Sequence, residues 1–186
     1  MKLKKLNAAL GLLTILCLLL HMGYSVYTYV TFYYNPTLSK AFQLPVIIAA
    51  CLHGVTGMLT VFLQNDGGSA ALYPRHNRRV ILQRVSAALI FPLLILHLNT
   101  FSLMKQSAEN GEKGVIIALI AAELLFFAAA ITHAAVSLTN GFITLGILSS
   151  RNTQKKIDTV VYVICALGFI AAVYSVVKGQ AAMFLS

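Results

Sequence analysis

Four histidines lie in four separate apolar stretches of the sequence: His21, His53, His97 and His133. An ionisable side chain inside the hydrocarbon layer of a membrane costs several kcal/mol, so by default it marks a functional site. Neutral imidazole is the usual ligand of haem iron, and a b-type haem with two axial histidines carries electrons. Four histidines, one on each of four helices, can hold two such haems between pairs of helices. We therefore predict that these four side chains are the iron ligands of two haem b groups.

The composition places the chain among membrane proteins. Of its 186 residues, 59% are hydrophobic and only 10% are charged, whereas soluble domains average about 25% charged residues. A helix needs roughly 20 apolar residues to cross a bilayer. The sequence holds five such stretches, at residues 6–33, 42–63, 80–104, 115–138 and 157–177. Membrane β-strands would alternate in polarity instead. We predict one all-α membrane domain over residues 1–186, a bundle of five antiparallel transmembrane helices.

Residues that break helices separate these stretches. Asn35-Pro36 ends the first, the segment Asn65–Gly68 ends the second, and Asn110-Gly111 separates the third from the fourth. Asn140-Gly141 either ends the fourth helix or is a packing point within a longer one. The start, MKLKK before an apolar run, also resembles a signal peptide. That run is too long for one and carries a histidine, so we expect a retained helix.

The net charge of +9 is distributed unevenly over the loops. When the loops are numbered alternately, one side collects Lys2, Lys4, Lys5, Arg75, Arg78, Arg79, Arg84, Arg151, Lys155 and Lys156. The other side holds Lys40, Lys105, Lys113 and Lys178. Because positive loops stay in the cytoplasm, the N-terminus is predicted to be cytoplasmic and the C-terminus outside, in the cell's inner (cytoplasmic) membrane. The basic charge then reflects topology and a docking surface, and no nucleic-acid partner is expected.

The depth of each histidine predicts how the four are paired. His21 and His97 lie roughly 15 residues, about 22 Å, from the predicted inner ends of helices that enter from the cytoplasm. They can share an outer haem. His53 lies about 17 Å from its inner end, and His133 is past the middle of a helix arriving from outside. These two can share an inner haem.

Small residues beside the histidines allow close packing against a flat macrocycle. Gly23 lies beside the first histidine, Gly54 and Gly57 follow the second, and Ala134 and Ala135 follow the fourth. The same residues could instead only let neighbouring helices approach one another, as in any membrane bundle.

Two segments resemble a known family. LPVIIAACLHGVTGM and LQRVSAALIFPLLILHL are similar to the second and third helices of the single-chain cytochrome b subunit of succinate dehydrogenases and fumarate reductases. The family's H-x-x-x-G element corresponds to His53 and Gly57. Its Q-R-x-[ST]-G element corresponds to Gln83, Arg84 and Ser86, with alanine at position 87 where the family usually has glycine.

The remaining ligands follow from the same resemblance. THAAVSLTNGFITLGI is similar to the fourth helix, with His133 as ligand, although the Asn-Gly lies closer to the histidine in the family. His21 falls where the first-helix ligand should be. The resemblance implies that ligands on the first and third helices hold the haem far from the catalytic subunits, and that those on the second and fourth hold the near one.

The resemblance also implies a function. Such subunits anchor a flavoprotein subunit and an iron–sulfur subunit on the cytoplasmic face of the membrane. They relay electrons between succinate or fumarate chemistry and a quinone in the lipid, most often menaquinone when one chain holds two haems. This chain has no dinucleotide fingerprint and no cysteine cluster, so FAD, the iron–sulfur clusters and the dicarboxylate site belong to the partners.

Several polar residues near the predicted sites have candidate roles. Arg84 lies near the inner end of the third span, where a guanidinium can bind a haem propionate or a quinone, and Gln83 and Ser86 can add hydrogen bonds. Arg79 could add a further hydrogen bond there, but positive-inside charge is the favoured interpretation of this residue. His76, in the polar stretch Tyr73–Arg79, is interpreted as a solvated loop residue.

Two further groups can be tied to quinone chemistry. Glu123 is the only acid well inside a span. It either carries protons for quinone near the outer haem or hydrogen-bonds a neighbouring helix. Tyrosines crowd the outer end of the first span. Most fit an interfacial aromatic belt, and Tyr24 or Tyr27 could face a quinone.

Two other functions stay open. A cytochrome b serving a hydrogenase or formate dehydrogenase would use the same chemistry with other soluble partners. A haem-free transporter or assembly protein would use the histidines to relay protons or bind metal. A reduced-minus-oxidised spectrum separates this last class, because only haem b gives sharp bands.

Overall fold

The computed structural model describes residues 2–64 and 74–185, and within these ranges the protein is helical with short connections. The helices are α1 (Lys2–Thr31), α2 (Pro36–Gln64), α3 (Pro74–Glu109), α4 (Lys113–Leu145) and α5 (Arg151–Phe184). Each is long and apolar enough to cross a membrane. The predicted all-α architecture with five membrane-spanning helices is therefore confirmed for the described residues.

The helices extend beyond the apolar stretches that predicted them. Residues 74–79, which we expected to form a polar loop around His76, are the first turns of α3. That expectation was wrong because apolar length measures the membrane core, whereas a helix continues until a residue breaks its backbone hydrogen bonds. Proline suits the first position of a helix and arginine, which occurs three times in this segment, is a good helix former, so α3 begins directly at Pro74.

Among the described residues, each predicted helix-breaking pair lies at the junction between two helices, with one exception. Asn35 caps α2, because its Oδ1 accepts hydrogen bonds from the backbone N–H of Thr37 and Leu38 at 3.0 and 3.1 Å. Gly111, between α3 and α4, has a φ of 74°. The exception is Asn140-Gly141, which lies inside α4; that helix ends at Gly146, with a φ of 80°. The segment Asn65–Gly68 lies outside the described residues.

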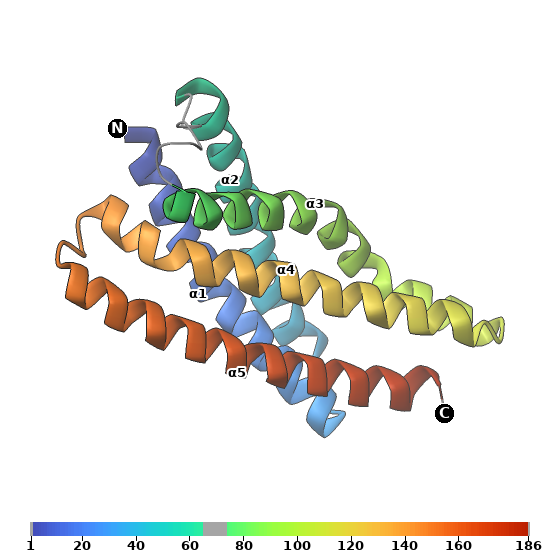
Figure 1. The fold of residues 1–186 in the computed structure, drawn as a ribbon. Coiled ribbons are helices and arrows are strands. Elements are labelled where there is room, and N and C mark those ends of the chain that lie inside the picture. The colour runs from blue at the N-terminus through green and yellow to red at the C-terminus, as the bar shows by residue number, and fades with distance from the viewer. Residues whose placement is uncertain (1, 65–73, 186) are drawn as a thin grey trace.

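The helices form two groups that cross obliquely (Figure 1). Helices α3, α4 and α5 lie side by side, and the antiparallel hairpin of α1 and α2 crosses them. Helix α1 packs against both α4 and α5, whereas α2 packs against α1. Among the described residues, no Cα atom of α1 comes within 8 Å of α3, and none of α2 comes within 8 Å of α4. Side chains alone can connect those two pairs of helices.

Glycines on α4 and α5 let α1 approach closely. A Cβ atom at Gly141 would lie 3.6 Å from the side chain of Leu12, and one at Gly168 would lie 3.4 Å from Met22. A Cβ atom at Gly179 would overlap the ring of Tyr29. Small residues have this role in many membrane bundles. Asn140-Gly141 is thus a packing point within a helix, one of the two alternatives left open above.

The distribution of polarity is that of a protein surrounded by lipid. Large apolar side chains are exposed, for example Phe62 at 79% and Phe91 at 68%. Buried positions include many polar residues: Thr60, Ser86, Thr100, Ser107, Glu123, Thr139, Ser175 and Gln180. In water this arrangement would be unfavourable, whereas in a bilayer polar groups gain by facing one another.

Helix α3 bends along its length (Figure 1), and Pro92 lies within it. Proline lacks the N–H that would bind the carbonyl of residue 88 and its ring crowds that carbonyl, so it bends a helix. His97 follows Pro92 by little more than one turn. The bend therefore helps to set the direction of the turn that carries His97.

Candidate functional site

The four membrane histidines come together as two pairs. The rings of His21 on α1 and His97 on α3 have centres 6.5 Å apart, with an angle of 82° between their planes. The rings of His53 on α2 and His133 on α4 have centres 6.2 Å apart, at 60°. These are the partners that the depth count grouped together. Each pair joins two helices whose backbones stay apart.

The donor set of each pair fits one axially ligated iron. Two metal–nitrogen bonds of about 2 Å, together with the half-widths of two imidazole rings, place the ring centres roughly 6 Å apart. Both observed distances agree with this value. All four rings are half-buried. The distances therefore fit an iron held between the two rings of each pair, and haem ligation itself stays a prediction.

Backbone carbonyls orient the rings of the inner pair, His53 and His133. The Nδ1–H of His133 donates to the carbonyl oxygen of Gln83 at 3.0 Å, and that of His53 donates to the carbonyl oxygen of Asn7 at 3.1 Å. Metal-binding histidines almost always donate their second ring N–H to a carbonyl or carboxylate, which fixes the tautomer. With Nδ1 occupied in this way, Nε2 is the nitrogen available to iron.

A close approach of α1 makes the His53 contact possible. A Cβ atom at Gly11 would lie 3.0 Å from Cε1 of the His53 ring, so a larger residue would displace the ring. Thr56, one turn after His53, donates to the Asn7 side chain at 2.9 Å and adds a second hydrogen bond between α1 and α2. Sequence reasoning missed Gly11, Asn7 and Thr56. Only Gly11, a glycine within an apolar helix, had a sequence signal that could have been noticed.

Gly11→Ala is expected to weaken haem binding at the inner pair. The added methyl group pushes the His53 ring from its carbonyl acceptor, and changes in such supporting contacts lower metal affinity by about 10- to 100-fold. The measurement is haem retained per chain during competition with a haem-scavenging protein. Gly114→Ala is the control, because a Cβ atom there has no neighbour within 4 Å. Equal retention in both variants would contradict the proposed role of Gly11.

A carboxylate orients one ring of the outer pair, His21 and His97. The Nδ1–H of His97 donates to Glu123 on α4, at 2.9 Å from Oε2 and 3.0 Å from Oε1. Glu123 is only 3% exposed. The ring of His97 also stacks on Phe126, with centres 4.7 Å apart. Nδ1 of His21 is buried without a hydrogen-bond partner among the described residues. Glu123 therefore makes the hydrogen bond to a neighbouring helix that was one of its two predicted roles.

The two pairs lie at different depths of the bundle. Along α4, Glu123 at the outer pair precedes His133 at the inner pair by ten residues, a rise of about 15 Å. Along α1, Asn7 at the inner pair precedes His21 by 14 residues, about 21 Å. The inner pair is nearer the end that holds the N-terminus (Figure 1).

The residues of the Q-R-x-S element lie beside the inner pair. Gln83 contributes its carbonyl oxygen to His133, and the hydroxyl of Ser86 lies 3.2 Å from Nδ1 of the same ring. Both residues therefore contact an iron-ligand candidate directly. Arg84 is exposed on α3, and a propionate or quinone contact by any of the three stays a prediction.

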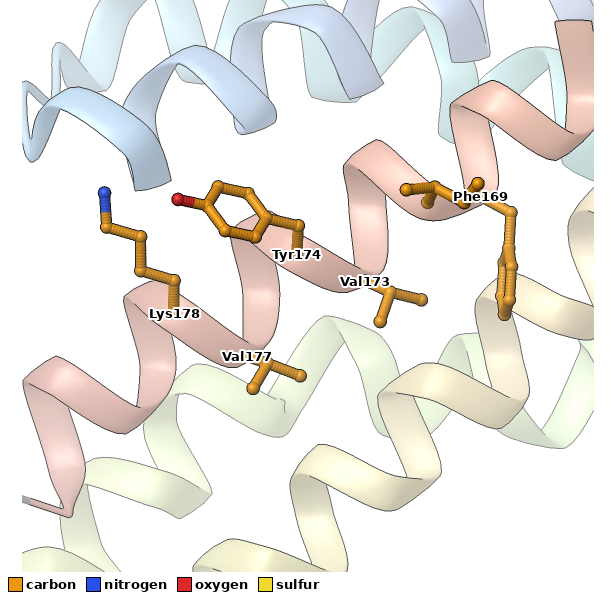
Figure 2. Close-up of a pocket in the computed structure, with 6 residues that line it drawn as sticks. Phe169, Val173, Tyr174, Val177 and Lys178 are labelled. Atoms are coloured by element: carbon orange, nitrogen blue, oxygen red, sulfur yellow. The ribbon is translucent and has the colours of Figure 1, made fainter.

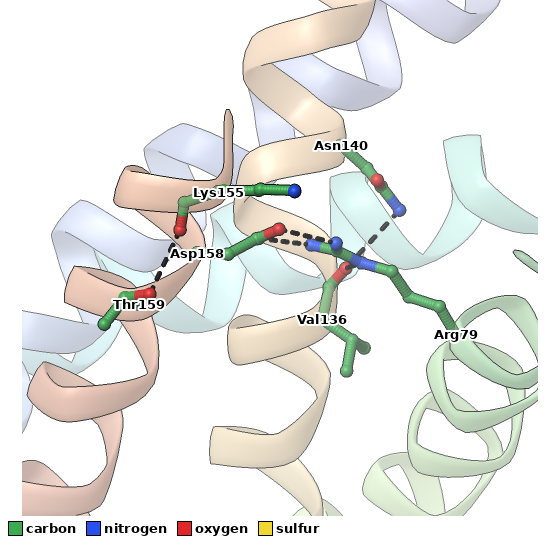
Figure 3. Close-up of polar contacts among 6 residues, drawn as sticks. All are labelled: Arg79, Val136, Asn140, Lys155, Asp158 and Thr159. Carbon is green, nitrogen blue, oxygen red and sulfur yellow. Dashed lines mark hydrogen bonds and ion pairs between the residues drawn. The ribbon is translucent and has the colours of Figure 1, made fainter. Parts of the chain in front are cut away.

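Arg79 joins three helices, α3, α4 and α5 (Figure 3). Its guanidinium binds both carboxylate oxygens of Asp158 on α5, at 2.9 and 3.1 Å, and its Nε–H donates to the carbonyl oxygen of Val136 on α4 at 2.8 Å. We interpreted Arg79 as topological charge, but the structure adds a specific ion pair. Sequence reasoning missed Asp158, an acid at the start of an otherwise apolar span.

Tyr24 and Tyr27, the two tyrosines that could face a quinone, contact residues near the turn between α1 and α2. The Tyr24 hydroxyl donates to the carbonyl of Asn35 and accepts from the backbone N–H of Asn35, both at 2.9 Å. These two hydrogen bonds stabilise the turn between α1 and α2. The ring of Tyr27 packs against Tyr33. Quinone binding by either stays a prediction.

A shallow apolar hollow lies on α5 (Figure 2). Its lining residues are Phe169, Ile170, Val173, Tyr174, Val177 and Lys178. No histidine lines it, so it is separate from both pairs.

The described residues contain no group of three or more histidine, cysteine, aspartate or glutamate side chains able to hold a bare metal ion. Paired histidines suit an iron whose other four ligands are supplied by a porphyrin. Comparison of the chain with protein-family models, curated proteins and solved structures finds no match.

Proposed function

We propose that this chain is the two-haem cytochrome b anchor of a succinate dehydrogenase or fumarate reductase complex. His21 and His97 hold the outer haem, and His53 and His133 hold the inner one. The observation that carries the proposal is that the imidazoles form two neighbouring pairs at two depths, with ring centres 6.5 and 6.2 Å apart. Three of the four rings donate Nδ1–H to a carbonyl or carboxylate, as iron-binding histidines do.

The protein's own contribution is to hold the imidazoles at fixed positions and in a fixed tautomer. Haem b supplies one-electron redox chemistry when bound between two histidines. Helices α1 and α4 each carry residues of both sites, so they set the distance between the sites. An electron entering at one depth can then reach the other within the same bundle.

The proposed soluble partners, a flavoprotein and an iron–sulfur protein, dock at the end that holds the N-terminus. Arg151, Lys155 and Lys156 are exposed at the start of α5, at that end. Their charge agrees with a cytoplasmic location and supplies a polar docking surface. Quinone in the lipid, menaquinone being usual in the resembled family, is the proposed redox partner in the membrane.

The test is a pyridine haemochrome assay and a redox titration of the purified chain. The expected result is two haem b per chain with two resolved midpoint potentials. A chain that is well folded by circular dichroism but takes up no haem would overturn the proposal and favour the transporter or assembly function. Two haems with hydrogenase or formate dehydrogenase subunits co-purifying would keep the electron relay and change the partner.

A further inference from the structure

We infer that Glu123 lowers the reduction potential of the outer haem through its hydrogen bond to His97, an inference that rests on the proposed function. Glu123 is a positioning residue in this role, because it acts on the iron through the imidazole.

The geometry provides the first step. Both carboxylate oxygens of Glu123 lie within 3.0 Å of Nδ1 of His97, and the carboxylate is almost fully buried. The corresponding acceptors at the inner pair are the neutral backbone carbonyls of Asn7 and Gln83. The two sites thus have the same ligands but differ in the charge of the group behind them.

The second step is the effect of that charge on the ligand. A carboxylate attracts the Nδ1 proton more strongly than a carbonyl does, so the imidazole becomes a more basic ligand. A more basic axial ligand stabilises ferric over ferrous iron and lowers the potential. Hydrogen bonding around the ligands is one of the means by which proteins set haem potentials.

The surroundings of His97 preserve this effect. Its ring stacks on Phe126 at 4.7 Å and meets Phe127 edge-on at 6.1 Å. The Glu123 acceptor is itself only 3% exposed, and electrostatic interactions are stronger at buried sites. His21 has no hydrogen-bond partner at Nδ1 among the described residues. Within the outer pair, the carboxylate therefore acts through His97.

The experiment is a redox titration of Glu123→Gln in the purified, haem-loaded chain. Glutamine keeps the size and an acceptor oxygen but removes the charge. We expect the equilibrium constant for reducing the outer haem to rise about tenfold, a shift of about 59 mV for one electron. The inner potential should stay unchanged, and the low-spin electron paramagnetic resonance signal of one haem should move.

Glu112→Gln is the matched control, because it removes the same charge from the exposed α3–α4 turn. Two bound haems with unchanged potentials in Glu123→Gln would overturn the inference, whereas a wild type without haem would overturn the proposed function instead. If Glu123→Gln fails to retain the outer haem, Glu123→Asp decides, because it keeps a carboxylate on a side chain that is one CH2 group shorter. The longer path to Nδ1 of His97 should weaken the hydrogen bond and raise the outer potential, and an outer haem retained at an unchanged potential contradicts the inference.

Discussion

His97→Ala is expected to remove one of two haems per chain and to leave the other bound, while His53→Ala removes the other one. Among the described residues, neither pair belongs to a group of three or more potential metal ligands, so we expect no other side chain to replace the lost imidazole. The sites are separated by about 15 to 21 Å along the helices, so loss at one should not propagate to the other. The measurement is haem per chain together with the midpoint potential of the haem that remains.

The pairing is tested by the two remaining ligands. His21→Ala should give the same spectrum and potential as His97→Ala, and His133→Ala should match His53→Ala. His76→Ala is the control, because it removes a histidine that belongs to neither proposed pair. If His21→Ala and His53→Ala lose the same haem, the pairing is wrong even though both residues are ligands.

The sequence was sufficient for the fold class because five long apolar runs have one solution in a bilayer. Lipid offers no hydrogen bonds, so each run must satisfy its own backbone as a helix. The positions of the helix ends were harder to predict from the sequence. α3 begins at Pro74 rather than Val80 because the basic residues between them favour a helix without being apolar. Asn140-Gly141 looked like a break, yet its glycine is where α1 packs on α4.

The partners of the histidines were less predictable than the histidines themselves. Depth along a helix grouped the four rings, because ring position follows from residue number and a fixed rise. The acceptors behind His53 and His133 are backbone carbonyls, and every residue has one. Nothing in the identity of Asn7 or Gln83 marks its carbonyl as a ring acceptor. That choice depends on how the helices pack.

Asp158→Asn is expected to destabilise the folded bundle by about 2 kcal/mol. Breaking a buried ion pair from one side costs about 3–5 kcal/mol. The side chains of Arg79 and Asp158 are 23% and 24% exposed. Because they are not fully buried, we expect a cost below that range. Without the opposite charge, the guanidinium remains among α3, α4 and α5 with two neutral acceptors among the described residues, the Val136 carbonyl and the amide oxygen of the new asparagine. The measurement is SDS-induced unfolding in a mild detergent, with Arg78→Gln on the exposed face of α3 as the control.

A double-mutant cycle separates the ion pair from the general loss of charge. Arg79→Gln with Asp158→Asn removes both charges, so neither is left unpaired in an apolar setting. The double variant should therefore lose less stability than the two single variants together. Effects that add within about 0.5 kcal/mol would show that the pair is not coupled. Coupling would also bear on the inner site, because Arg79 lies one turn before Gln83 and Val136 lies close behind His133. Helix α5 carries no histidine, and through this ion pair it would still help to hold the His133 ring in place.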